Sequence, residues 1–261
     1  MRRNLAMTRV SRLIRSTFLT AALAIGSVAF AMPETVVLTN GWRLARSPDV
    51  SQPPAEISQI DYSDASWIPA VVPGTALTSY EKAGLIPDPY FGLNMARLSQ
   101  SFYNTNYWYR DKFLAPASLA GQKVWLNFDG INWKADIFLN GSFVGRINGP
   151  FIRGKFDVTG LINPGATNAL AVLIHWSNAT VWDAPTFICS ESWDFMPAIP
   201  GRNVGIYENV YLSSSGPVTI VDPFVTTDLP LPATSPATVT LKVDLTNSFL
   251  RRGERRAEGN D

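Results

Sequence analysis

Short runs in which apolar and polar residues alternate are the dominant pattern along this chain. In residues 123–128, Val124, Leu126 and Phe128 alternate with residues of a more polar face. A period of two places successive side chains on opposite faces of a β-strand, so this run predicts a strand with one buried face. Other strand-like runs cover residues 106–113, 151–158, 169–176 and 206–213.

One pair of runs carries a clear hairpin signal. The run 135–139 leads into Asn140-Gly141, and a second strand-like run, 142–147, follows directly. Asn-Gly favours the two-residue turns that join antiparallel strands. The best helix candidate is 75–83, which stops at Gly84. Short strands separated by Gly, Pro and Asn turns predict an all-β fold, an antiparallel sandwich or jelly roll.

The pattern changes near residue 217. The run 218–227 is strand-like, 229–236 is rich in proline like a linker, and 237–245 alternates cleanly, which predicts a half-buried strand. A single strand after a linker cannot bury its apolar face alone. The sequence therefore predicts that the start of a second domain follows a complete sandwich.

The expected domain organisation follows from these changes. Residues 32–216 form the jelly-roll domain, and 217–247 form a linker and the start of an incomplete immunoglobulin-like domain. The polar segment 248–261 contains four arginines and has no apolar face to bury, so we expect it to be disordered.

The first 31 residues have the composition of a signal peptide. They contain five arginines and no acidic residue, and the apolar run 18–30 ends in an Ala-x-Ala cleavage pattern at Ala31. The run is short for a membrane span. A buried N-terminal helix is the alternative, but five arginines fit poorly in a core. We expect a secreted or periplasmic protein that begins near Met32 and has no membrane partner after cleavage.

Charge and composition exclude several classes of function. The formal net charge is +1, and without residues 1–31 there remain 17 basic and 21 acidic residues. This balance gives no electrostatic case for nucleic acid binding. The chain has one cysteine, Cys189, and one histidine, His175. Zinc sites of the Cys/His type are therefore excluded, and no cofactor or metal is implied.

Several motifs occur in a fixed order and resemble one enzyme family. They are Val72-Pro-Gly-Thr75, the loop 84–94, Trp108-Tyr-Arg110, Phe128-Asp-Gly-Ile-Asn132, Leu139-Asn-Gly141, Ser192-Trp-Asp-Phe-Met-Pro197 and Gly205-Ile-Tyr207. Together they resemble the N-terminal sugar-binding domain of glycoside hydrolase family 2. The most similar branch contains exo-β-glucosaminidases and β-mannosidase-type enzymes, and the resemblance extends from about Gly41 to about Asn247.

The resemblance implies a jelly roll, then an immunoglobulin-like domain, then a (β/α)₈ barrel that carries the catalytic glutamates. A barrel needs about 250 residues, whereas 16 residues follow Leu245. We therefore expect the N-terminal, non-catalytic segment of a secreted glycoside hydrolase that cleaves terminal β-linked glucosamine or mannose residues. A free-standing carbohydrate-binding module and a non-functional fragment are the alternatives.

Glycoside hydrolysis usually requires two carboxyl groups on either side of the scissile bond. In the family both belong to the barrel, so no catalytic residue is assigned here. Asp129 and Asp136 are interpreted as acids at strand ends or on a solvated face.

The resemblance assigns substrate binding to Asp194 and Trp193. In this branch the Trp-Asp pair lies on a loop at the mouth of the barrel. Asp194 would accept hydrogen bonds from sugar hydroxyls, which a carboxylate does well, and Trp193 would form an apolar wall. The alternative is a loop aspartate bound to nearby amides or to Arg202. Phe195 stands where the branch commonly has a second tryptophan.

The loops 85–94 and 182–204 hold many aromatic residues and few charges. We expect them to lie at one end or side of the sandwich and to form its largest apolar patch, with Asp194 at the edge.

Overall fold

The computed structural model describes residues 34–177, 199–232 and 236–247. These ranges belong to one compact unit, Pro33–Asp261, which is distinct from Met1–Met32. The expected signal peptide and the expected disordered tail lie outside the described residues. No helix within these ranges is long and apolar enough to cross a membrane.

Short strands form most of the described structure, with a few helices of one or two turns. The strands are β1 (Thr35–Val37), β2 (Arg43–Arg46), β3 (Ile68–Pro69), β4 (Gly74–Thr75), β5 (Tyr107–Leu114), β6 (Lys123–Phe128), β7 (Lys134–Leu139), β8 (Ser142–Asn148), β9 (Gly154–Asp157), β10 (Thr167–His175), β11 (Gly205–Ile206), β12 (Val210–Ser215), β13 (Val218–Asp228) and β14 (Thr238–Asn247). The helices are η1 (Ser47–Asp49), α2 (Pro54–Ile57), α3 (Ala76–Lys82), α4 (Asn94–Arg97), α5 (Gln100–Tyr103) and η2 (Ala117–Leu119).

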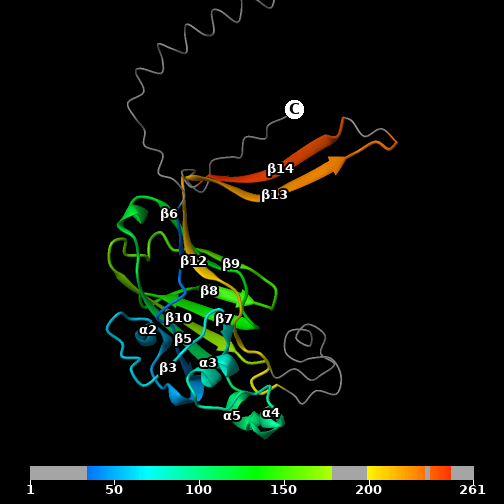
Figure 1. The fold of residues 1–261 in the computed structure, drawn as a ribbon. Helices are drawn as coiled ribbons and strands as arrows, with labels where there is room; N and C mark the ends of the chain where they lie inside the picture. The colour runs from blue at the N-terminus through cyan, green and yellow to red at the C-terminus, as the bar shows by residue number, and fades with distance from the viewer. Residues whose placement is uncertain (1–33, 178–198, 233–235, 248–261) are drawn as a thin grey trace, which may run out of the picture. The chain divides into compact units, whose positions relative to one another are not determined.

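Two antiparallel sheets form a sandwich. One has the strand order β1-β12-β6-β9, and the other has the order β3-β2-β5-β10-β7-β8. Neighbours such as β12 and β6 are far apart in the sequence, as expected when the chain crosses between sheets. Figure 1 shows α3, α4 and α5 gathered at one end of these strands. The expected all-β antiparallel fold is confirmed.

The core lies between the two sheets. Val124, Leu126 and Phe128 on β6 are fully buried in it, as their alternation predicts. From the other sheet, Tyr107 and Tyr109 on β5 belong to the same cluster. Alternate residues of each strand thus meet alternate residues of the opposite sheet, which is how an antiparallel sandwich buries its apolar side chains.

The predicted hairpin turn is also confirmed. Asn140 and Gly141 connect β7 and β8 with φ values of 50° and 84°. Positive φ at both central residues is the requirement of the turn type that matches strand twist, and glycine reaches it without steric cost. The Asn140 side chain also donates to the Leu161 carbonyl (2.8 Å) and to Asn168 Oδ1 (2.7 Å), so it joins the turn to neighbouring loops.

A buried arginine attaches the segment 47–67 to the outer face of the six-stranded sheet. The side chain of Arg110 on β5 is fully buried and donates to the Ile57 carbonyl (2.8 Å), to the Gln59 carbonyl (2.6 Å) and to the Asp64 carboxylate. Beside it, Trp67 packs in a second apolar cluster with Trp108 of β5. The segment thereby covers apolar surface that would otherwise face water.

The strands β13 and β14 form a separate two-stranded antiparallel ladder. Every residue of β14 is exposed, so the expected half-burial of 237–245 is wrong. The proline-rich run 229–236, interpreted as a linker, joins these two paired strands. Sequence alternation predicted the strand itself, but it could not show whether another layer covers one face.

Candidate functional site

A tight turn at residues 202–205 closes one end of the sandwich. Asn132 exchanges backbone hydrogen bonds with Gly205 (2.9 and 3.1 Å), and its side-chain amide donates to the carbonyls of Arg202 (3.2 Å) and Asn203 (3.1 Å). Arg202 and Asn203 have φ values of 48° and 55°. A left-handed conformation is uncommon for arginine, although asparagine adopts it more readily, and the amide of Asn132 holds both residues in the backbone shape of the turn.

A close backbone approach makes Gly205 necessary at this turn. β11 pairs with β4, and a Cβ at residue 205 would lie 2.4 Å from the Gly74 carbonyl oxygen and 2.7 Å from Thr75 Cα. Gly205→Ala is therefore expected to lower the free energy of unfolding by about 2–3 kcal/mol, measured by urea denaturation. Gly160→Ala is the matched control, because a Cβ there meets nothing within 4 Å, and a change within about 0.5 kcal/mol is expected. Equal effects of the two substitutions would contradict this account.

The same turn fixes the start of α3. The Ala76 amide donates to the Val204 carbonyl (2.8 Å). Thr75 caps the helix, since its hydroxyl accepts from the Thr78 amide (3.1 Å). An N-cap threonine satisfies an amide that has no partner within the helix. The helix predicted over 75–83 therefore forms almost as expected, and its first turn lies against the 202–205 turn.

The loop after α3 is held by its own hydrogen bonds. Asp88 Oδ1 accepts from the Tyr90 amide (2.9 Å), and Asn94 Nδ2 donates to the Asp88 carbonyl (2.9 Å). The loop presents Tyr90, Phe91 and Leu93 to solvent, each more than two-thirds exposed. Aromatic residues on an ordered loop at the end of a β-sandwich form a surface suited to ligand contact.

These elements surround a cavity of about 380 Å³, which we call the loop-end cavity. It is lined by Thr75, Leu77, Thr78, Glu81, Lys82, Asp88, Pro89, Tyr90, Met95, Ile199 and Asn203.

The lining suits a polyhydroxylated ligand. Two carboxylates, two threonine hydroxyls and an amide provide donors and acceptors, and Tyr90 and Leu77 provide apolar surface. Lys82 pairs with Glu81 at 3.1 Å, so one cation balances one of the two acids. Among the described residues, no group of three or more histidine, cysteine or acidic side chains could hold a metal ion.

The predicted substrate-binding residues Asp194 and Trp193 lie outside the described residues. The nearest described residue after them, Ile199, lines the loop-end cavity together with Asp88 and Tyr90. The described ends of the loops 85–94 and 182–204 therefore meet at one end of the sandwich, as predicted for these parts.

The expectation that these loops form the largest apolar patch of the sandwich stays a prediction, because the aromatic residues of 182–204 lie outside the described residues. Loop 85–94 exposes Leu85, Tyr90, Phe91 and Leu93, whereas the ladder of β13 and β14 exposes a larger set. That set is Val218, Ile220, Phe224, Val225, Val239, Leu241, Val243 and Leu245. The sequence predicted a half-buried strand only for 237–245, so the exposure of the apolar residues there was not anticipated.

Two acids outside the cavity have clear structural partners. Asp136 accepts from Arg146 Nε (2.5 Å) and Nη2 (2.9 Å) and contacts His175 Nε2 at 2.9 Å. Burial alone would raise the pKa of Asp136, but the hydrogen bonds from Arg146 and His175 outweigh it and lower that pKa. Asp136 was interpreted as an acid on a solvated face, but it is buried in this cluster. Asp129 lies 3.7 Å from Arg153 near the end of β6.

Sequence reasoning missed most of the cavity lining. Thr75, Thr78 and Glu81 were recognised as part of a helix, but not as residues of a site. Their spacing of three places them on one side of α3, which was the only available signal. The partners across the cavity, Ile199 and Asn203, come from a segment more than 100 residues later.

An antiparallel sandwich of these two sheets, with a loop-lined polar cavity at one end, is a jelly-roll domain of the kind that occurs in carbohydrate-active proteins. Its fold matches the crystal structure of exo-chitosanase CsxA from Amycolatopsis orientalis, with a TM-score of 0.70 and 23% identity over 82% of this chain and 24% of that one. The family model "Glycosyl hydrolase 2 galactose-binding domain-like" matches residues 55–208. The chain belongs to this family.

Two relatives of known name show which branch of the family this chain resembles. The mannosylglycoprotein endo-β-mannosidase of Lilium longiflorum is 34% identical over 71% of this chain and 22% of its own length. The exo-β-D-glucosaminidase of Streptomyces avermitilis is 29% identical over 85% of this chain and 24% of its own length. The chain thus spans less than a quarter of each of these relatives, and the predicted family and branch are confirmed.

Proposed function

We propose that this chain is the N-terminal, non-catalytic sugar-binding part of a glycoside hydrolase. The parent activity would be hydrolysis of terminal β-linked glucosamine or mannose residues; in support, one relative is named as an exo-glucosaminidase and another as a mannosidase. The observation that carries the proposal is the family match over residues 55–208, which includes the α3 face of the loop-end cavity. A free-standing carbohydrate-binding module is the second candidate, supported by the polar and aromatic lining of that cavity.

In this proposal the loop-end cavity forms the domain's side of the substrate pocket. Asp194 would accept hydrogen bonds from hydroxyls of the terminal sugar, and Trp193 would provide an apolar wall beside it. The position of Ile199 at the cavity, five residues after Asp194, supports this assignment. The signal-like pattern of residues 1–31 supports a secreted or periplasmic location.

The test uses an enzyme rebuilt by joining this chain to a family 2 catalytic barrel. Asp194→Asn in that enzyme is expected to lower kcat/KM on nitrophenyl β-glucosaminide or β-mannoside by roughly 10–100-fold, because one charge-assisted hydrogen bond is lost. Asp61→Asn, an exposed acid outside the loop-end cavity, is the control and should leave kcat/KM unchanged.

The chain by itself is expected to show no turnover of either substrate. Unchanged kinetics in Asp194→Asn would remove this residue from the site. Turnover by the purified chain, abolished by an acid-to-amide substitution within it, would refute the non-catalytic role.

A further inference from the structure

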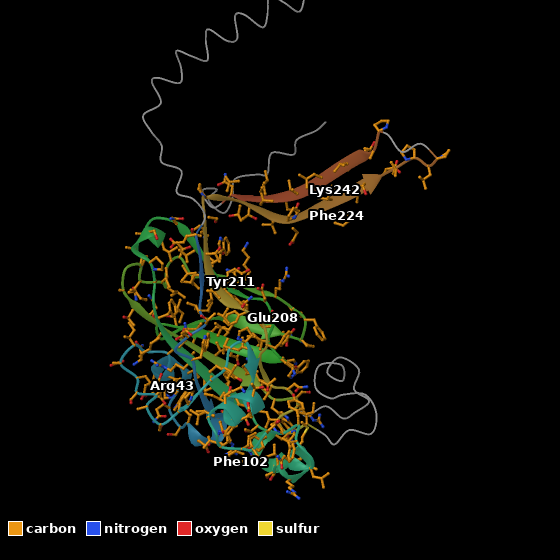
Figure 2. All side chains as sticks on the ribbon, viewed as in Figure 1. Arg43, Phe102, Glu208, Tyr211, Phe224 and Lys242 are labelled. Atoms are coloured by element: carbon orange, nitrogen blue, oxygen red, sulfur yellow. The ribbon has the colours of Figure 1, made fainter. Side chains whose placement is uncertain are left out.

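A second, more open cavity of about 730 Å³ lies at the end of the four-stranded sheet. Its lining comes from three places: Asp129 directly follows β6, Tyr207 and Glu208 lie between β11 and β12, and Phe151 and Arg153 precede β9. None of these five residues lines the loop-end cavity. Figure 2 labels Glu208, which lies just before β12 in the sequence, and Tyr211, which lies on β12.

The floor of this cavity is an aromatic ring held against the backbone. A Cβ at residue 130 would lie 2.6 Å from two ring atoms of Tyr207, so only glycine allows the ring to lie there. The ring of Phe151 meets Tyr207 edge to face, with centroids 6.5 Å apart and an interplanar angle of 66°. The two rings therefore form a defined apolar surface rather than isolated exposed side chains.

The backbone at Phe151 is strained. Its φ is 58°, a left-handed value that is a genuine outlier for a bulky residue. The side chain is 67% exposed, so the strain is not compensated by burial in the core. Strained, exposed residues are concentrated at ligand-binding positions, where the backbone fixes a side chain for contact.

The rim of the cavity is polar with an excess of negative charge. Asp129 and Glu208 contribute two carboxylates, whereas Arg153 contributes one guanidinium, 3.7 Å from Asp129. Asp129 therefore has a cationic neighbour, while the exposed Glu208 carboxylate has no ion-pair partner among the described residues. An acceptor of this kind favours a ligand that carries an ammonium group.

We propose that this cavity is a second saccharide-binding site, which takes a β-linked amino-sugar chain. One face of a sugar ring is apolar and would stack on Phe151 and Tyr207. Its hydroxyl groups would bind Asp129 and Arg153, and its ammonium group would pair with Glu208. The inference rests on the proposed function, because the carbohydrate class comes from it, but the site is distinct from the loop-end cavity.

The test measures binding of a β-1,4-glucosamine hexamer and of cellohexaose to the full chain by calorimetry. The glucosamine hexamer is expected to bind more tightly, because only it can pair with Glu208.

Phe151→Gly should raise the Kd of the glucosamine hexamer about tenfold through loss of stacking. The same substitution should not lower Tm, since glycine adopts the left-handed φ without strain. Glu208→Gln should raise the Kd of the glucosamine hexamer at least threefold and leave that of cellohexaose unchanged.

Two control variants make the result specific. Phe143→Ala removes another well-exposed phenylalanine from β8 on the other sheet and should change neither Kd. Asp194→Asn tests the loop-end site and should leave most of the binding intact.

Several outcomes would overturn the proposal. These are an unchanged Kd in Phe151→Gly, equal affinity for both hexamers, binding lost in Asp194→Asn but kept in Phe151→Gly, and no binding of either hexamer. The last result would instead favour a surface that packs against another protein segment. Hydrolysis by the rebuilt enzyme is measured separately, so the proposed function can stand when this site fails.

Discussion

Replacing Arg110 by alanine is expected to lower the free energy of unfolding by about 3–5 kcal/mol, one of the two largest effects anticipated for this chain. The guanidinium is fully buried and serves two carbonyls and the Asp64 carboxylate. Its removal leaves these acceptors without their donor and detaches the segment 47–67 from the sheet. Urea denaturation followed by tryptophan fluorescence measures the change, and Trp67 and Trp108 lie close enough to report it.

Arg97→Ala is the matched control, because Arg97 is an exposed residue at the end of α4. Its effect should stay within about 0.5 kcal/mol. Arg110→Lys should recover only part of the stability, since an ammonium group cannot reproduce the planar fork of donors. A loss below 1 kcal/mol in Arg110→Ala would show that the segment 47–67 is held by its apolar contacts alone.

Asp111→Asn is expected to raise stability at pH 8 by on the order of 4 kcal/mol while changing little at pH 4. The Asp111 side chain lies in the interior, and neither carboxylate oxygen has a hydrogen-bond partner among the described residues. Burial raises the pKa of Asp111 from 3.8 to about 7. A buried charge without adequate partners is costly, and asparagine has the same shape without the charge.

The pH dependence follows from this shift. Below pH 4 the carboxyl is protonated in both the folded and the unfolded state, so it costs nothing. Between pH 4 and 7 the unfolded chain releases its proton while the folded chain keeps it, and stability falls as pH rises. Above pH 7 the cost is constant. Thermal unfolding of both proteins from pH 4 to 8 measures the difference.

Asp157→Asn provides a control of opposite sign. Lys123 and Thr159 lower the pKa of Asp157, so its ionised form stabilises the fold above its unfolded pKa. This variant should lose a little stability at neutral pH and none in acid. A gain in Asp111→Asn that is the same at pH 4 and pH 8 would show that packing, rather than ionisation, is responsible.

The strands with regular alternation were predictable from the sequence. β6 occupies the predicted residues 123–128, and β7 and β8 flank the Asn140-Gly141 turn. In β6 the period of two agrees with the buried face, and between β7 and β8 the turn chemistry agrees with the hairpin. The strands β3, β4 and β11 have two residues each and carry no period, so pairing between distant segments alone defines them.

The candidate site was predictable only in part. The described ends of the loops 85–94 and 182–204 lie together at one end of the sandwich, as expected from the aromatic, charge-poor sequence of both loops. The hydroxyl groups of Thr75 and Thr78 were not expected at this cavity. Their position depends on the hydrogen bond from the Ala76 amide at the start of α3 to the Val204 carbonyl. The second cavity gave no sequence signal at all. Phe151 reads as an ordinary strand residue until its φ and its contact with Tyr207 are known.

The sequence alone determined the all-β class, the hairpin at residue 140 and the family, because these depend on local periodicity, turn residues and motifs in a fixed order. The tertiary structure decided which polar groups are buried. Arg110 and Asp111 are neighbours on one strand, but one satisfies its hydrogen bonds while the other has a raised pKa. Their side chains point to opposite faces of β5, one toward the segment 47–67 and the other toward the core. Residues distant in the sequence form the surroundings on each face of the strand. The local sequence pattern therefore could not predict which of the two charged groups would find partners.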